Sequence, residues 1–384
     1  MATKLEYFDL LNVIYDQIIE ISRHNHQMIN PNHYIAKIKL NQQQCQHFSQ
    51  FNSAVAIINY ELFSSNFSEK NDTLLKSLDE VKNKLESDLS HFQSAKMQLK
   101  VHSCVKQTLL QQKDFKTLES YLIYSLEDFE EKKLFNSDNH KEKIVMLSWI
   151  INTLTKNLNF NKALYYSEQL YKSLFEHHKL LYNSYIWTYY QGLVINYSFL
   201  GRIDEVIDLL NDLRNSKQFK GIPFYDIFVF LNLTTHYYCK NDINNALKNL
   251  ALINATDTYK TLSENWKISF SIVELILHIE NKDYEYVLNK TQAFRRYFQD
   301  ALKKEVYQRE KHFISILRYL AQIPKPYKDT KVIEKINAFI DNSPPFEPGS
   351  NEAINYSIWL QSKIEKKSYY QLILNVVSKD TLQN

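Results

Sequence analysis

The stretch YQGLVINYSFLGRIDEVIDLLNDL, residues 190–213, decides the fold of this chain. Its first half places large apolar side chains at three- and four-residue steps, which is the spacing of one helix face: Tyr190, Leu193 and Tyr197. A short break around Gly201 follows, and glycine readily takes the backbone conformations that tight turns need. A second stripe then begins at once, with Ile203, Val206, Leu210 and Leu213. The stretch therefore predicts two helices joined by a tight turn.

The same turn recurs five times along the chain. The motifs are Gln112-Lys113-Asp114-Phe115, Asn157-Leu158-Asn159-Phe160, Leu200-Gly201-Arg202-Ile203, Lys240-Asn241-Asp242-Ile243 and Asn281-Lys282-Asp283-Tyr284. They recur at steps of 40–45 residues, and three positions after each stands a mostly small or β-branched residue: Leu118, Ala163, Val206, Ala246 and Val287. Such a residue lets the second helix approach the first closely, and an Asp or Asn in the turn can cap that helix. A regular step of this size is the signature of stacked helix hairpins.

Composition supports an all-α chain and excludes several function classes. Only 4 glycines and 7 prolines occur in 384 residues, too few for the turns of a sheet protein or for a phosphate-cradling loop. The net charge of +3 predicts no strong overall field for nucleic acid or membrane. Three scattered cysteines, no signal-peptide pattern and no long apolar run predict a cytoplasmic protein that does not enter a membrane.

The repeats resemble the tetratricopeptide (TPR) family. The matching positions are Tyr190, Leu193, Tyr197, Gly201, Ile203, Val206, Leu210 and Leu213, followed in the next unit by Phe230, Leu233, Tyr237, Ile243, Ala246, Leu250 and Ile253. Two features depart from the family pattern. Val194 and Thr234 stand where a small residue is usual, and the step exceeds the usual ~34 residues. The resemblance implies a right-handed α-α superhelix whose first helices line a concave face.

Three regions are expected along the chain. Residues 1–100 form an N-terminal helical region, which includes a pair of helices across 33–65 and a long helix near 73–102. Residues 101–322 form the TPR-like hairpins. Residues 323–384 form C-terminal capping helices, because a solenoid must cover its exposed end to stay soluble.

The sequence predicts no metal, no cofactor and no catalytic centre. Cys45, His47, His102 and Cys104 offer two thiols and two imidazoles, but each pair is two residues apart and would point to different sides of a helix. His177-His178 after Glu176 gives no metal-binding pattern. No nucleophile elbow, P-loop or dinucleotide motif occurs. An enzyme with a site assembled from scattered residues ranks last among the functions considered.

The leading hypothesis is a non-enzymatic scaffold that binds a protein or peptide in a concave groove. Tyrosines and other aromatics on the first helices would supply large and rigid contacts. The candidate contact residues are Tyr185, Trp187, Tyr189, Asn196, Tyr225, Asn232 and His236. The alternative reading of these tyrosines is packing between repeats, with the hydroxyl pointing outwards.

A basic stretch between residues 295 and 335 supports a second hypothesis, a nucleic-acid-associated or regulatory repeat protein. On one continuous helix, Lys304, Lys311 and Arg318 would recur every seven residues and share a face, with Arg296 nearby. Leu302 and Val306 would lie on the apolar side of that helix. The competing interpretation is an ordinary solvated face, because acidic residues are interspersed.

Overall fold

The structure is a computed structural model that describes residues 7–25, 28–64, 95–219, 221–222, 224–346 and 352–383. Every regular element in these ranges is a helix, so the predicted all-α class is confirmed. The chain divides into two compact units, Met1–Thr153 and Leu154–Asn384, and each is described separately. The predicted region boundaries near residues 100 and 322 stay predictions.

The first unit contains two helix hairpins. Its helices are α1 (Phe8–Ser22), α2 (Pro31–Ser64), α4 (Ala95–Gln112), α5 (Phe115–Glu131) and most of α6 (His140–Lys156). The expected pair of helices across 33–65 is wrong, because α2 is a single helix of 34 residues. Glutamine is a good helix former, so the glutamines at 42–44 and 46 do not interrupt it. The expected long helix near 73–102 lies outside the described residues up to position 94, and the remainder begins α4.

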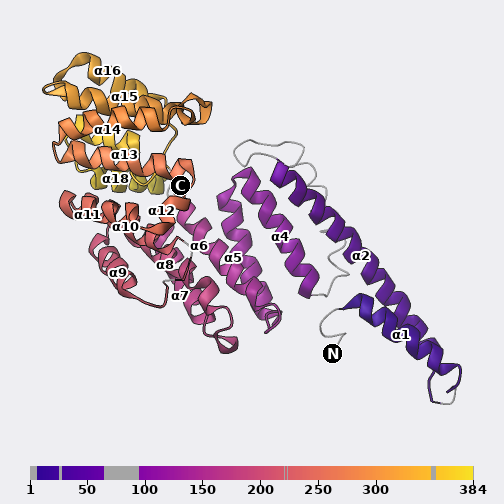
Figure 1. Ribbon diagram of the computed structural model, residues 1–384. Helices are drawn as coiled ribbons and strands as arrows, with labels where there is room; N and C mark the ends of the chain where they lie inside the picture. Colours follow the sequence, from indigo (N-terminus) through magenta and orange to yellow (C-terminus); the bar gives the residue numbers. More distant parts are fainter. Residues whose placement is uncertain are drawn as a thin grey trace. The chain divides into compact units, whose positions relative to one another are not determined.

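The second unit continues as stacked hairpins and ends in two further helices (Figure 1). The hairpin helices are α7 (Phe160–Ser173), α8 (Tyr182–Phe199), α9 (Ile203–Asn215), α10 (Tyr225–Cys239), α11 (Ile243–Asn254), α13 (Glu264–Glu280), α14 (Tyr284–Tyr297), α15 (Gln308–Gln322) and α16 (Thr330–Asp341). A short helix, α12 (Asp257–Thr261), lies between α11 and α13, and the chain ends with α17 (Tyr356–Glu365) and α18 (Tyr369–Gln383). This arrangement is a TPR-like stack of helix hairpins.

All five predicted turns have the same geometry. The second helices α5, α7, α9, α11 and α14 each begin at the last residue of a motif. Two residues earlier the backbone is left-handed, with φ between 57° and 79°: Lys113, Leu158, Gly201, Asn241 and Lys282. The next amide N–H bonds to the carbonyl five residues before it, as in Arg202 to Tyr197 at 3.0 Å, which defines a Schellman motif. Only one of these left-handed positions is glycine, so a Gly-based search would find one turn in five.

The residues three positions into the second helices form the seam of each hairpin. Leu118, Ala163, Val206, Ala246 and Val287 are all 0% exposed, as the pattern predicted. The turn caps are less uniform. Asp114 and Asp242 accept hydrogen bonds from the amides of Thr117 and Asn245 at 3.0 and 3.1 Å, whereas Asp283 instead lies against Asn281 and His278.

The repeat step exceeds that of the TPR family for two structural reasons. The first helices are long, with 18 residues in α8 and 17 in α13. The connections between hairpins are also long, and one of them holds α12. Neither feature changes the turn, so the chain keeps the hairpin of the TPR family although its repeats are longer.

The C-terminal helices fold back along the first helices of the array. Trp359 of α17 is fully buried, and its Nε1 donates to Glu280 Oε1 of α13 at 2.6 Å. In α18 the ring of Tyr369 lies 5.4 Å from that of Tyr238 in α10, and the Tyr370 hydroxyl donates to the Ser198 carbonyl of α8 at 2.6 Å. These helices therefore contact α8, α10 and α13. That they also cap the end of the stack stays a prediction.

Candidate peptide-binding face

The candidate site is built on α8 and α10, the first helices of two consecutive hairpins. Aromatic rings fix the position of these helices within the array. Trp187 of α8 packs against Tyr225 and Phe228 of α10, with ring centroids 5.3 and 4.5 Å apart. Phe219, in the connection that precedes α10, packs against Tyr190 and Tyr225. A rigid aromatic cluster thus holds the backbone of the site before any ligand arrives.

One side of each helix is only partly covered by this packing. On α8 the exposed or half-buried side chains recur at steps of four, three and four residues: Ser184, Thr188, Gln191 and Ile195. On α10 the half-buried side chains on one side are Phe228, Leu231, Asn232 and Thr235. We call these eight residues the first-helix face. It combines apolar surface with amides and hydroxyls and contains no charge.

The predicted aromatic contacts lie beside this face, in the seams between helices. Tyr185, Trp187 and Tyr189 are half-buried. The Tyr189 hydroxyl donates to Glu168 of α7 at 3.0 Å, and burial beside that carboxylate raises its pKa. These rings therefore support the first-helix face more than they cover it.

Three other predicted contact residues are buried in helix packing. Asn196 is 0% exposed; its amide donates to the Gly192 carbonyl and its oxygen accepts from Thr155. The buried Tyr225 hydroxyl donates to the Leu213 carbonyl of α9. These side chains are already hydrogen-bonded inside the array, so they do not contribute to the open surface.

His236 is the third buried candidate. Its Nε2 lies 2.6 Å from Ser198 Oγ of α8, and its Nδ1 lies 2.6 Å from the Asn232 carbonyl. Burial lowers the pKa of His236 to about 4. At neutral pH this imidazole is uncharged, and its hydrogen bond to Ser198 links α10 to α8. Asn232 remains on the face, where its amide nitrogen bonds to the Phe228 carbonyl at 2.9 Å.

Of the eight residues of the first-helix face, the sequence predicted only Asn232. The prediction favoured tyrosines, so it included neither Phe228 nor the six non-aromatic residues Ser184, Thr188, Gln191, Ile195, Leu231 and Thr235. The available signal was the helical period: continuing from Ser184 at the spacing of one helix side selects the stripe on α8.

The C-terminal helix closes one end of the face. The Tyr370 hydroxyl of α18 donates to the Ser198 carbonyl near the end of α8, and the Tyr369 ring lies beside that of Tyr238 near the end of α10. A Cβ added at Gly201 would meet the side chain of Leu374 in α18, at 4.0 Å. The first-helix face is therefore bounded by α18 at the C-terminal ends of α8 and α10.

The basic candidates do not share one helix face. Lys304 lies in extended backbone between two short 3-10 turns, Ala301–Lys303 and Glu305–Tyr307, and α15 begins only at Gln308. Its ammonium lies 3.7 Å from Glu264. The predicted apolar stripe is also wrong at Val306, which is exposed, although Leu302 is buried. The continuous helix was expected because the charges repeat every seven residues, but the turns at 301–307 break that register.

A different group of cations gathers around Tyr319. Lys335 of α16 lies 3.7 Å from the centroid of the Tyr319 ring. Lys335 together with Arg318 and Arg295 lowers the pKa of the Tyr319 hydroxyl. Arg296, Lys311 and Arg318 are exposed, as expected for basic-face candidates. Three neighbouring hairpin helices, α14 to α16, thus contribute positive charge to one place.

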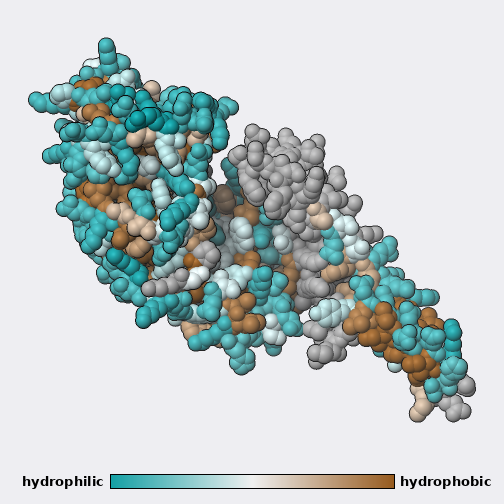
Figure 2. All heavy atoms as spheres, viewed as in Figure 1, coloured by the Kyte–Doolittle hydropathy of each residue, from teal (hydrophilic) through white to brown (hydrophobic). Residues whose placement is uncertain are grey.

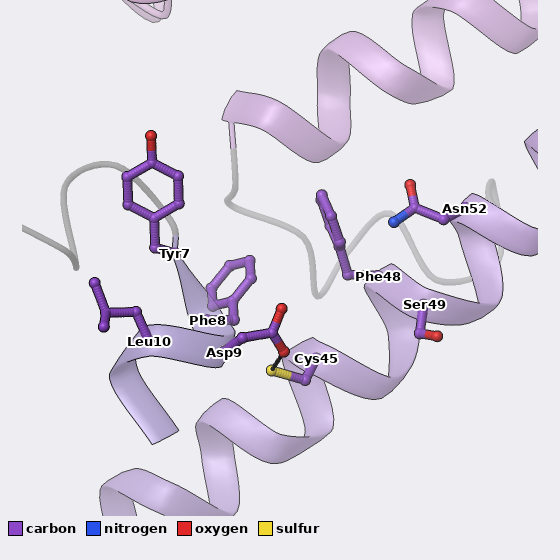
Figure 3. Close-up of a pocket in the computed structure, with 8 residues that line it drawn as sticks. All are labelled: Tyr7, Phe8, Asp9, Leu10, Cys45, Phe48, Ser49 and Asn52. Carbon is purple, nitrogen blue, oxygen red and sulfur yellow. Dashed lines mark hydrogen bonds between the residues drawn. The ribbon is translucent and has the colours of Figure 1, made fainter. Parts of the chain in front are cut away.

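Cavities of about 550 and 150 Å³ are also present elsewhere in the described ranges. The larger of these is formed by α1 and α2 around Phe8, Cys45 and Phe48 (Figure 3). The smaller, of about 150 Å³, is lined by Trp266, Glu310 and Glu352, and Glu352 pairs with Arg309. Neither contains a residue that the sequence had singled out for peptide binding.

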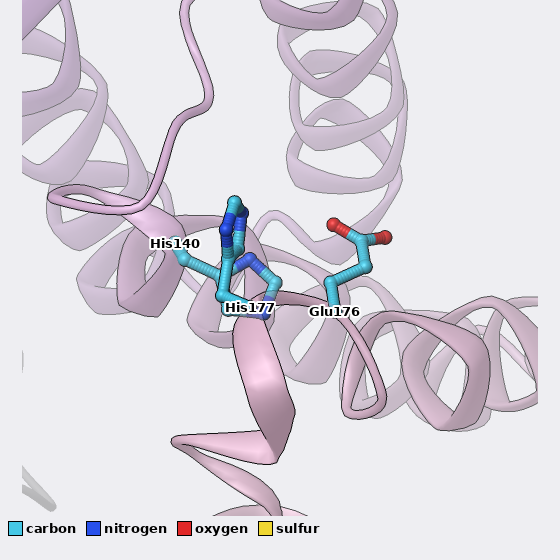
Figure 4. Close-up of side chains that lie close together, drawn as sticks. All are labelled: His140, Glu176 and His177. Atoms are coloured by element: carbon cyan, nitrogen blue, oxygen red, sulfur yellow. The ribbon is translucent and has the colours of Figure 1, made fainter.

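The histidines of the connection between α7 and α8 were expected to form no metal centre, and that stays a prediction. His177 and His178 both have positive φ, at 47° and 59°. Figure 4 draws Glu176 and His177 together with His140, the first residue of α6. His140 belongs to the first unit and the other two to the second, so we assign them no joint site.

In the part of the chain that the structure describes, no helix is both long enough and apolar enough to cross a bilayer.

The hairpin stack and its open first-helix face define a TPR-like helical-repeat protein. No family model matches the sequence, and no curated protein matches it. Among solved structures, the chain is similar to the apo form of the quorum sensor NprR from B. thuringiensis. The identity is 12%, the TM-score is 0.57, and the match covers 98% of this chain and 99% of that one.

A second similar structure is NprR in complex with its cognate peptide NprX. The identity is 14%, the TM-score is 0.47, and the match covers 97% of this chain and 99% of that one. At such identities, only the first match supports the assignment, and it concerns the fold alone.

Proposed function

We propose that this chain is a non-enzymatic scaffold that binds a peptide, or a peptide-like segment of another protein, on the first-helix face. The observation that carries the proposal is the partly exposed stripe of α8 and α10, whose eight side chains are exposed or half-buried while aromatic packing, such as that of Trp187 on Phe228, fixes the two helices. A surface that is ordered before binding loses less conformational entropy when a ligand docks.

The chemistry of the face defines the kind of ligand. Ile195, Phe228 and Leu231 offer apolar contacts for one or two hydrophobic anchors of a peptide. Gln191 and Asn232 offer amides that can bond to the peptide backbone. Because none of the eight residues is charged, we expect affinity to change little with salt concentration.

The likeness to apo NprR gives this proposal further support. That protein is a quorum sensor, so at least one protein of this fold serves in sensing. For this chain we propose only that the same kind of array carries a ligand-binding face.

A selection experiment tests the proposal. A displayed library of random short peptides is selected on the full chain, and the dissociation constant of the best peptide is measured by fluorescence anisotropy. A Gln191→Ala/Phe228→Ala variant should weaken binding at least tenfold, about 1.4 kcal/mol. The matched control is Tyr165→Ala, which removes an aromatic ring that is 60% exposed on the second helix α7. Equal binding by all three proteins would overturn the assigned face.

The cations around Tyr319 favour a second candidate function, association with a phosphate backbone. Arg295, Arg318 and Lys335 have no acidic partner within the ranges that the structure describes. Binding of a nucleic acid there should fall steeply as salt rises, and an Arg318→Ala/Lys335→Ala variant should reduce that slope. An unchanged slope in the variant would exclude this surface.

A further inference from the structure

Helix α1 carries a strip of apolar side chains that faces solvent. Leu10, Val13, Ile14 and Ile21 are 50%, 58%, 37% and 50% exposed, while Leu11 on the other side is buried. Figure 2 shows hydrophobic residues gathered over this part of the molecule. Leu10, Ile14 and Ile21 are four and seven residues apart, so they lie along one side of the helix. A contiguous exposed apolar strip of this kind marks an interaction site.

The same helix is purely acidic. Asp9, Asp16 and Glu20 are exposed and recur at seven- and four-residue steps, so they line one flank of the strip, and Phe8–Ser22 contains no Lys or Arg. No cation of the described residues forms an ion pair with these three carboxylates; Asp9 only accepts a contact from Cys45 Sγ, at 3.6 Å. Among the described residues, nothing therefore pairs with their charge.

A cavity continues the strip at its N-terminal end. Leu10 lines it together with Phe8 and Phe48, whose ring centroids are 6.0 Å apart, and Asp9 stands beside them (Figure 3). Its volume of about 550 Å³ would admit a large apolar side chain. The hairpin is held in register by Asn41, whose amide donates to the Phe8 carbonyl and to Asn12 Oδ1, each at 2.6 Å. The strip and the cavity are thus presented by a fixed pair of helices.

We infer that α1 is a docking surface for a basic amphipathic helix of another protein. Such a helix would lay its apolar side on Leu10, Ile14 and Ile21 and insert one anchor into the cavity. Its lysines or arginines would pair with Asp9, Asp16 and Glu20. A second copy of α1 is a poorer occupant, because it would bring three more carboxylates against these three.

Two synthetic peptides test the inference. One is an amphipathic helix of leucines and lysines, and the other has glutamates in place of the lysines. With the full chain, fluorescence anisotropy should show binding of the lysine peptide, weakened about tenfold by rising salt, and at least tenfold weaker binding of the glutamate peptide. Equal binding of both peptides would overturn the inference, since it would show hydrophobic adhesion without charge recognition.

Charge reversal separates recognition from a folding defect. Asp16→Lys/Glu20→Lys changes only exposed positions, so the far-UV circular dichroism should not change, and the preference should invert towards the glutamate peptide. The Leu10→Ser/Ile14→Ser variant, which keeps the wild-type carboxylates, should bind neither the lysine peptide nor the glutamate peptide. Retained preference for the lysine peptide in the reversed variant would place its site elsewhere and refute the assignment.

Two further measurements distinguish other occupants and the other face. Light scattering should show the same mass for the wild type and for Leu10→Ser/Ile14→Ser; a dimer that this variant dissolves would assign the strip to a second copy and overturn the inference. The Gln191→Ala/Phe228→Ala variant should bind the lysine peptide normally. The two proposals can therefore fail independently, because each surface is tested with its own variant.

Discussion

Two kinds of helix hairpin occur in this chain, and they use their apolar residues differently. In the repeats of the second unit, the seam residues Ala163, Val206, Ala246 and Val287 have no exposed surface. In the N-terminal hairpin, by contrast, α1 turns Leu10, Val13 and Ile21 to solvent. A hairpin inside an array has neighbours that cover its apolar sides, whereas the hairpin of α1 and α2 leaves one side available. The difference teaches that the same local motif provides stability in one region and surface in the other.

The largest effect should come from the tryptophan that ties α17 to the array. Trp359→Ala removes a fully buried side chain and its bond to Glu280, and should lower the free energy of unfolding by about 3–5 kcal/mol. Trp266→Ala, at a site that is 40% exposed, is the matched control and should cost below about 1 kcal/mol. Urea denaturation measures both. Similar losses in the two variants would mean that α17 is not part of the core.

The second prediction concerns pH. The pKa of His236 is about 4 in the fold, against about 6.5 in an unfolded chain. Between these values the unfolded state binds the proton and the folded state does not, so stability falls as the pH falls. The loss from pH 6.5 to 5 should be about 1.6 kcal/mol.

The His236→Gln variant isolates this contribution. Its stability should depend less on pH over the same window than that of the wild type. A residual slope should remain, because burial also lowers the pKa of His102 in α4, to about 3. Parallel pH profiles for the two proteins would show that His236 is not buried between α8 and α10.

The third prediction tests the repeated turn. Gly201 has φ of 79°, and a Cβ there would meet only an ordinary van der Waals contact with Leu374, so Gly201→Ala should cost about 1 kcal/mol through backbone strain alone. Lys282→Gly, at the equivalent left-handed position of a later turn, should instead be stabilising, by up to about 1 kcal/mol. Thermal unfolding reports both changes. Gly221→Ala is the control, because Gly221 has neither a positive φ nor a neighbour within 4 Å, and it should not destabilise.

The smallest effect is expected on α1. Leu10→Ser/Ile14→Ser changes exposed side chains, so the free energy of unfolding should stay within about 0.5 kcal/mol per site. The same urea measurement checks it. A loss of several kcal/mol would show that the strip packs against the rest of the protein, and the contrast between the two kinds of hairpin would fail.

The sequence predicted the local structure of the repeats well. Five turns and the starts of five helices follow from motifs of four residues, because a Schellman turn depends on its own neighbours and on the apolar stripe that follows. The seam residues were predictable for the same reason. The prediction of two helices across 33–65 was wrong. No strong turn signal in that stretch supported it, and the structure has one helix there.

The candidate site was predicted less completely, because its residues meet partners far away in the chain. The amide of Asn196 bonds to Thr155, 41 positions earlier, and Tyr370 bonds to Ser198, 172 positions earlier. Neither contact can be predicted from the pattern of residues within α8. The prediction that Lys304 shares a helix face with Lys311 and Arg318 was wrong for a local reason. Two 3-10 turns before α15 interrupt the helix that the spacing of the charges had indicated.

Hydrogen exchange with and without the selected peptide tests the central claim most directly. If the first-helix face binds the peptide, added protection should appear in α8 around residues 184–195 and in α10 around 228–235, while α1 exchanges as before. Protection confined to α1, to the cations around Tyr319 or to the second helices, with α8 and α10 unchanged, would contradict the account.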